Sequence, residues 1–171
     1  MSASRIERTW EHAGLDCAVL VMDMGHRCGY VRVPDDHPWH GLGYTDEVPN
    51  PAETLTEDTP VEDAMEAFGV ITVFAAAVGG NLAERSARLE LQVRVHGGVT
   101  YAGHGCGDLP EGWWFGFDCA HAGDAPDLAE ATPVHREIHA GWHDPSEHVW
   151  TLEEVAAETE RMAEQIAAVP A

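Results

Sequence analysis

The sequence lacks lysine altogether, and its nine basic residues are all arginine, against 30 aspartates and glutamates. The formal net charge at pH 7 is therefore −21. Such a charge repels phosphate backbones, and because the arginines are scattered, we expect no direct binding to duplex nucleic acid. Arginine together with abundant alanine and glycine indicates a GC-rich genome first, and adaptation to high salt second. An acidic mimic of DNA is the remaining alternative.

Long apolar runs and secretion signals are also missing. The longest apolar run, 68–78, is too short to cross a bilayer. The first 14 residues are polar and mixed in charge, unlike a signal peptide. No two of the four cysteines form a C-x-x-C pair, so zinc-finger spacing is absent. We therefore expect a cytoplasmic protein with free thiols and no membrane partner; a disulfide between Cys17 and Cys28 has only hairpin geometry in its favour.

Nucleotide-cradling motifs and internal repeats are absent as well. The chain contains neither G-x-G-x-x-G nor G-x-x-x-x-G-K-[ST]. Its 171 residues, 44% of them hydrophobic, are enough for one domain over 1–171 with an ordinary core.

Hydrophobic patterning predicts an α+β domain. Residues 15–24 and 28–33 form two strands around a turn, and Leu89–Val95 alternates most cleanly of all. Two further strands are expected at 99–102 and 113–119. The result is an antiparallel or mixed sheet with helices packed on one face.

A C-terminal amphipathic helix is expected over about 151–168. Thr151 and Glu154 form a T-x-x-E capping box. The apolar stripe recurs at helical spacing, and Glu153, Glu158, Glu160 and Glu164 fall outside it; its members are Leu152, Val155, Ala156, Thr159, Met162, Ala163 and Ile166.

Between the two halves lies a long loop, about 34–60, with five prolines. A loop of this length is often functional. His37-Pro38-Trp39-His40 makes it either a lid that contacts substrate or an exposed loop pinned by Trp39. A helix is expected at 61–68, whereas Gly69–Val78 fits a buried strand and a buried helix equally.

The block from His96 to Asp124 is the strongest functional signal. It holds eight of the 17 glycines together with three histidines, two cysteines and three aspartates. Possible ligands and proton carriers beside tight glycine turns are typical of a small active or binding site.

The end of the block offers three interpretations. If the strand persists, Cys119 and His121 share a face, and thiolate and imidazole suit zinc or another divalent metal. Alternatively Cys119 is a nucleophile with a histidine base. The third interpretation makes Cys119 a buried thiol, with Asp118 or Asp124 capping the turn.

The start of the block, His96-Gly97-Gly98, gains importance from what a hairpin would place beside it. Its glycines permit positive φ and a close backbone approach. A hairpin would bring His96 beside His121. The candidate metal ligands are therefore His96, Cys119 and His121, and the candidate acid–base groups are His96, Asp118, Cys119, His121 and Asp124.

Two further histidine groups are weaker signals. His104 and Cys106 lie in a glycine-rich loop that could wrap a metal or be only a loop. His135 and His139 share a helix face, but the order H-R-E-I-H is not H-E-x-x-H. Nearby proline and glycine argue against a long helix there, and we expect a polar surface segment.

Three blocks occur in a specific order: C-G-Y-V-R-V-P-x-x-H-P-W-H-G-x-x-Y, V-H-G-G-V-T-Y-A-G and W-W-F-G-F-D-C-A-H-A-G-D. In these blocks the chain resembles a family of small uncharacterised proteins from actinobacteriophages, other phages and their bacterial hosts. The resemblance implies a phage or prophage context, and hence the cytoplasm of a bacterial host. It implies no activity.

The expected function is a small metal-dependent or Cys/His-dependent hydrolase-like enzyme that acts on a small polar or nucleotide-like substrate. One alternative is a phage accessory protein that binds a host protein or signalling molecule. The other is a virion or assembly component.

Overall fold

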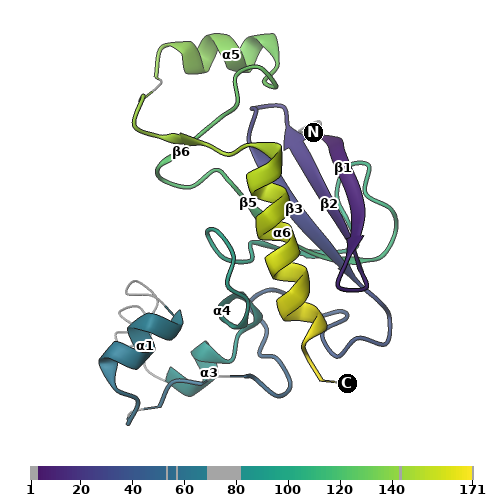
Figure 1. The fold of residues 1–171 in the computed structure, drawn as a ribbon, viewed down its shortest axis with the longest axis vertical. Helices are drawn as coiled ribbons and strands as arrows, with labels where there is room; N and C mark the ends of the chain where they lie inside the picture. The colour runs from purple at the N-terminus through teal and green to yellow at the C-terminus, as the bar shows by residue number, and fades with distance from the viewer. Residues whose placement is uncertain (1–3, 53, 57, 69–81, 143, 171) are drawn as a thin grey trace.

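The fold confirms the expected α+β class. The computed structural model describes residues 4–52, 54–56, 58–68, 82–142 and 144–170, so the ambiguous segment Gly69–Val78 lies outside the described residues. A five-stranded antiparallel sheet carries a long C-terminal helix on one face (Figure 1). The sheet has the order β1-β2-β3-β5-β4, with β1 at Ser4–His12, β2 at Leu15–Met22, β3 at Arg27–Val33, β4 at Tyr101–Gly103 and β5 at Trp113–Asp118.

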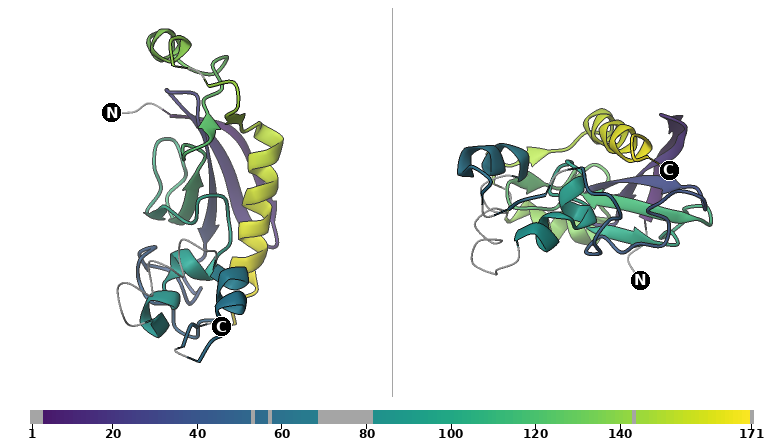
Figure 2. Two further views of the ribbon diagram at one scale, coloured as in Figure 1. Left: turned by 90° about the vertical axis from the view of Figure 1, so that its left-hand side faces the viewer. Right: turned by 90° about the horizontal axis from the view of Figure 1, so that it is seen from below.

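The remaining elements lie around this sheet. A short parallel pair consists of β6 and β7. Helices α1 and α3 lie towards one end of the molecule and α5 at the other, whereas α6 runs along the sheet (Figures 1 and 2). Their bounds are α1 Val61–Phe68, α3 Leu82–Ser86, α4 Leu89–Gln92, β6 Asp124–Ala125, α5 Pro133–Ala140, β7 His148–Val149 and α6 Leu152–Ala167.

The central strands are buried on both faces, with strict alternation along each strand. The face beneath α6 belongs to the larger apolar core, which includes Cys17, Val19, Val31, Val33, Phe115 and Phe117. The opposite face forms a smaller core that Cys106 and Leu109 help to cover; its buried members are Ala18, Leu20, Cys28, Tyr30 and Trp114. The aromatic run of β5 therefore divides between the two faces.

Helix α6 begins as the sequence predicts. The Thr151 hydroxyl accepts a bond from the Glu154 N–H at 3.3 Å, and the Glu154 carboxylate accepts one from the Thr151 N–H at 2.8 Å. The expected stripe is buried apart from Leu152, which is partly buried. Glu158 differs from expectation because it is only 8% exposed, and it accepts a bond from the backbone N–H of His96 at 3.1 Å.

The predicted strand Leu89–Val95 is wrong. One turn of helix, α4, occupies Leu89–Gln92 instead. Tertiary hydrogen bonds set this local structure, because the N–H groups of Leu89 and Glu90 donate to the carbonyls of Asp46 and Tyr44, each at 2.9 Å. Leu89 and Val93 are buried, and their spacing of four residues fits a helical turn as well as alternation does.

The N-terminal half contributes an edge strand and a long loop. The sequence predicts no element at Ser4–His12, which forms β1, a charged edge strand. In the described part of 34–60 the backbone is loop, with one isolated bridge from Glu47 to Arg88. Trp39 and Val48 are buried in the larger core, which fits a loop pinned by Trp39.

The four cysteines are free thiols. Cys17 belongs to the core under α6 and Cys28 to the core on the opposite face, so the two side chains lie on different sides of the sheet. Within the described ranges, no helix is long and apolar enough to cross a membrane.

Candidate metal centre

Asp124 is the centre of a polar cluster at the start of β6. Its side chain is only 4% exposed, and its two oxygens have different partners. Oδ1 accepts a bond from the indole N–H of Trp150 at 2.8 Å. Oδ2 accepts one from Nε2 of His96 at 2.8 Å and one from the backbone N–H of His121 at 2.9 Å. The turn that precedes β6 therefore aims a single carboxylate oxygen at two histidines.

The charge of Asp124 follows from these bonds. Burial alone would raise the pKa of the carboxyl, but the hydrogen bonds from His96, from the His121 backbone and from Trp150 outweigh burial, and the pKa lies below its ordinary value of 3.8. Asp124 is therefore a carboxylate at neutral pH, ready to act as an anionic ligand.

His96 is positioned by a turn and by an aromatic wall. The turn closes with a bond from the Gly98 N–H to the Val95 carbonyl at 2.9 Å. The imidazole lies over Trp150 with ring centroids 4.3 Å apart and an interplanar angle of 39°. Since a carboxylate can only accept, Nε2 of His96 carries the proton in its bond to Asp124.

His121 approaches from the turn after β5. Its ring meets that of His96 edge to face, with centroids 5.4 Å apart. Nδ1 of His121 is buried without a hydrogen-bond partner, 3.6 Å from Oδ2 of Asp124 and 3.8 Å from Oδ1 of Asp118. A buried ring nitrogen without a partner is costly in a protein interior, and an ion at this point would satisfy it.

Ligand atoms of His96, His121 and Asp124 all lie within 4.8 Å of one another. Zinc bonds of about 2.0–2.2 Å in a tetrahedron place ligand atoms about 3.3–3.6 Å apart. Of the distances from Oδ2 of Asp124 to the two nitrogens, 3.6 Å lies at the upper end of that range and 2.8 Å is shorter. The three groups therefore fit a zinc-sized ion once Nε2 of His96 has lost its proton and the side chains have moved slightly.

Asp118 stands beside this triad rather than in it. Its Oδ2 accepts a bond from the Thr100 hydroxyl at 2.9 Å, and its Oδ1 accepts one from the Ala120 N–H at 3.1 Å. Its contact with the cluster is the 3.8 Å approach to Nδ1 of His121. Asp118 thus caps the turn and adds negative charge next to His121.

Cys119 is not brought to the cluster. Strand β5 ends at Asp118, so the alternation that would place Cys119 and His121 on one face does not persist. The thiol is 1% exposed and belongs to the apolar core under α6. Burial raises the pKa of Cys119 far above neutrality, which keeps the group protonated. This position fits the interpretation of a buried thiol.

Trp150 and Glu158 are partners of the site that the sequence does not point to. Trp150 directly precedes the helix cap Thr151, a position that indicates packing and nothing more. In the sequence Glu158 is one of four glutamates outside the apolar stripe, yet its carboxylate accepts a hydrogen bond from the backbone N–H of His96. Both act through contacts across the fold, which no local pattern encodes.

The other histidine groups lie outside the cluster. His104 and His40 both contact Trp113, with ring centroids 5.0 and 5.8 Å away. Nδ1 of His135 bonds the Thr132 hydroxyl at 2.9 Å, and His139 lies on the same short helix, α5. Among the described residues, only His96, His121 and Asp124 form a group that could hold a metal.

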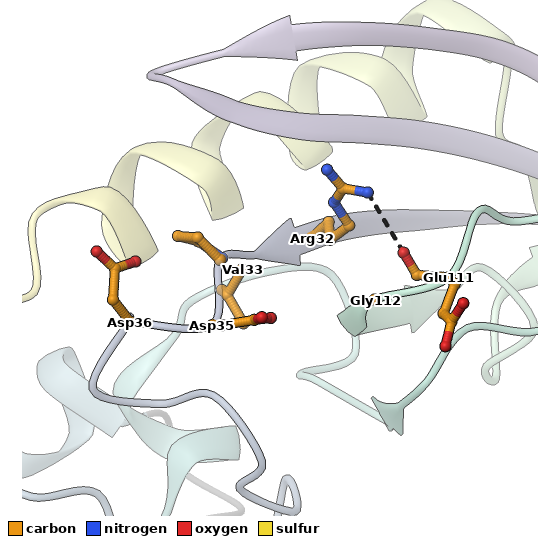
Figure 3. Close-up of a pocket in the computed structure, with 7 residues that line it drawn as sticks. Arg32, Val33, Asp35, Asp36, Glu111 and Gly112 are labelled. Atoms are coloured by element: carbon orange, nitrogen blue, oxygen red, sulfur yellow. Dashed lines mark hydrogen bonds between the residues drawn. The ribbon is translucent and has the colours of Figure 1, made fainter.

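An open depression of about 440 Å³ lies at the far end of β3 (Figure 3). Arg32 at its wall forms an ion pair with Asp16 at 2.6 Å and donates to the Glu111 carbonyl at 3.3 Å. Because Val33 pairs with Trp113 whereas Cys28 pairs with Asp118, this depression and the cluster lie at opposite ends of β5. Its lining residues are Arg32, Val33, Pro34, Asp35, Asp36, Glu111 and Gly112.

No known protein family, curated protein or solved structure matches the chain. The geometry of the cluster is therefore the basis for the function.

Proposed function

We propose that His96, His121 and Asp124 bind a divalent transition metal, zinc first, and that the protein is a small metal-dependent hydrolase-like enzyme. The observation that carries the proposal is the position of Oδ2 of Asp124, which lies 2.8 Å from one imidazole nitrogen and 3.6 Å from the other. Two imidazoles and one carboxylate are a ligand set that suits zinc better than magnesium or calcium.

The number of ligands supports a catalytic rather than a structural ion. Structural zinc sites use four protein ligands, whereas three protein ligands leave one position open. A zinc ion supplies Lewis acidity and makes water a nucleophile near neutral pH. Neither His96 nor His121 is fully buried, since their side chains are 25% and 34% exposed, so water and a small substrate can reach this edge.

The protein's own groups would then share the remaining tasks. Asp124 carries the negative charge that holds the ion, and Trp150 and the His121 backbone hold Asp124. Asp118, whose Oδ1 lies 3.8 Å from Nδ1 of His121, is not one of the three ligands and is the candidate proton acceptor. A small polar or nucleotide-like molecule is the proposed substrate class, because the cluster is polar and partly exposed.

The decisive experiment is metal analysis and zinc titration of the purified protein. We expect one zinc per chain, bound in the micromolar range or tighter, and strong loss of binding in His121→Ala and Asp124→Asn. His104→Ala is the matched control, because His104 also packs edge to face on a neighbouring ring but lies outside the cluster. A wild-type protein without zinc, whose thermal stability is the same in chelator and in zinc, would contradict the proposal.

Enzymatic activity needs a separate test. A panel of small esters, amides and phosphoesters, nucleotides included, is assayed with the zinc-loaded and the chelated wild-type protein. We expect hydrolysis of at least one class that disappears in chelator and in Asp118→Asn with zinc still bound. Stoichiometric zinc binding without hydrolysis of any substrate class would support the metal site and refute the enzymatic activity.

A second candidate function, binding of a host protein, is favoured by α5. Val134 and Ile138, four residues apart on α5, and Trp142, just after the helix, are each more than half exposed, and no residue of α5 is buried. Figure 1 shows α5 standing away from the sheet. With a net charge of −21, the fitting partner is a basic protein that offers an apolar groove to a helix. The resemblance to phage proteins agrees with a host partner of this kind.

This candidate is tested by affinity capture from host lysate at low salt. The wild type and the control variant Val61→Asp, at an exposed valine of α1, should retain the same basic protein. The variant Ile138→Asp should fail to retain it, and 0.5 M salt should release it from the wild type. Equal capture by Ile138→Asp, or capture of acidic proteins only, would refute docking through α5.

A further inference from the structure

We infer that Trp150 is the positioning residue of the metal centre, which keeps Asp124 a one-oxygen ligand and fixes the plane of His96. The inference rests on the proposed metal-binding function. The two carboxylate oxygens of Asp124 have different partners. The indole N–H of Trp150 donates to Oδ1, and Oδ2 alone faces the two histidines.

The indole acts on two of the three candidate ligands at once. Its N–H donates to Asp124 at 2.8 Å, and its ring lies against that of His96 with centroids 4.3 Å apart. A third imidazole, that of His148, meets the indole edge to face, with ring centroids 5.3 Å apart. One side chain therefore limits the rotation of the carboxylate and the tilt of the imidazole together.

Trp150 is itself held by the fold on both sides. Before it, β7 pairs in parallel with β6, which carries Asp124. After it, Thr151 caps α6. The carbonyl of Trp150 accepts a bond at 2.9 Å from Arg27, a side chain that is 6% exposed and also bonds Glu7 and Asp127. A residue whose backbone is fixed in this way can orient a ligand to within the tolerance that metal sites need.

The arrangement has a consequence for coordination. While Oδ1 is engaged by the indole, the carboxylate contributes one oxygen, and three protein ligands leave the fourth position of a tetrahedron open. When the indole N–H is removed, Oδ1 loses its partner and the carboxylate can offer both oxygens, which would fill that position. Loss of such a supporting partner lowers metal affinity by about 10- to 100-fold in other metal sites.

The test uses Co²⁺ as the probe, because its visible spectrum reports coordination number. Wild type, Trp150→Phe and Trp113→Phe are titrated with Co²⁺. Trp113 is the matched control: its indole N–H also donates to an oxygen, the Leu42 carbonyl at 3.2 Å, and its ring also contacts imidazoles. We expect intense four-coordinate bands for wild type and Trp113→Phe. For Trp150→Phe we expect about 10- to 100-fold weaker binding and the weaker bands of a five-coordinate ion.

Two outcomes separate this inference from the proposed function. No Co²⁺ or Zn²⁺ binding by the wild type would refute the metal site as a whole. Binding by the wild type, with unchanged affinity and spectrum in Trp150→Phe, would overturn the role of Trp150 and leave the metal site in place.

A measurement on the wild type covers the case in which Trp150→Phe does not fold. In a ¹⁵N-labelled sample, the assigned indole N–H of Trp150 should shift on addition of Zn²⁺ and stay protected from solvent exchange. A resonance that does not shift, or that exchanges as fast as a free indole in the zinc-loaded protein, would equally overturn the inference.

Discussion

The backbone of Gly97 lies directly against the imidazole of His121, where a Cβ atom would be 2.0 Å from Cε1 of the ring. The same residue has a φ of +67°, in the region that favours glycine. Two physical demands, space for a ring and a left-handed backbone, thus meet at one position between His96 and Gly98. Glycine is the residue that satisfies both.

Gly97→Ala should therefore displace His121 and abolish zinc binding. The matched control is Gly98→Ala, because Gly98 has a φ of +82° but its Cβ would meet no atom closer than 3.9 Å. Both variants should lose about 1–3 kcal/mol of unfolding free energy from backbone strain. Only Gly97→Ala should lose zinc in calorimetric titration, and equal zinc affinity in the two variants would contradict this packing.

A second close approach predicts a stability effect without a functional one. A Cβ on Gly29 of β3 would lie 2.2 Å from Oγ1 of Thr159, where α6 crosses the sheet. Gly29→Ala should cost about 1–3 kcal/mol or more in urea unfolding, because a packed core resists an added methyl group. Gly141→Ala is the control, since its Cβ would meet nothing within 4 Å. Equal stability of the two variants would show that α6 does not pack this closely.

The polar network behind the site predicts a larger effect. Arg27 is buried, and its guanidinium donates to Glu7 at 2.6 Å and to Asp127 at 2.9 Å. Arg27→Met would leave the carboxylate of Glu7 buried without its main partner, and breaking such a pair costs about 3–5 kcal/mol. Arg8→Met removes an ion pair with the exposed Glu153 and should change stability far less. Chemical denaturation of both variants measures the difference.

Local signals explain which parts of the fold the sequence predicts. The capping box of Thr151 and Glu154 and the apolar stripe of α6 are encoded within a few residues, and both are confirmed. Leu89–Val95 is different, because carbonyls of a distant loop, Asp46 and Tyr44, decide its backbone. No periodicity within the segment carries that information.

The same distinction applies to the candidate site. The sequence predicts that His96 and His121 meet, and the structure places them with Asp124. It cannot predict that β5 ends at Asp118, so that Cys119 stays in the core with Phe115 and Phe117 whereas His121 does not follow that alternation. Of the partners, Glu158 lies on α6 and Trp150 lies two residues before it, and both reach the site through tertiary contacts.

The lowered pKa of Asp124 predicts how the metal-free protein responds to acid. A carboxyl whose pKa is lower in the folded than in the unfolded state stabilises the fold above its unfolded pKa, and this contribution disappears as pH falls through the folded pKa. Asp124 should therefore contribute fully above its ordinary pKa of 3.8 and progressively less below it. Asp124→Asn should flatten the pH dependence of the unfolding free energy in this acidic window, whereas Asp36→Asn, at an exposed aspartate, should not. Parallel curves for wild type and Asp124→Asn would contradict the lowered pKa.

The reactivity of the cysteines tests whether Cys119 is buried in the core, away from the candidate metal centre. Burial raises the pKa of the Cys17 and Cys28 thiols to about 12 each, and that of Cys119 further still, whereas Cys106 is partly exposed. Because the thiolate is the reactive form, a thiol reagent at pH 8 should label Cys106 first and the other three only on unfolding. Cys106→Ser should therefore abolish fast labelling of the native protein and leave three reactive thiols in denaturant. Rapid labelling of Cys119 in the native state would instead bring it out of the core and restore it as a candidate nucleophile or ligand beside His121.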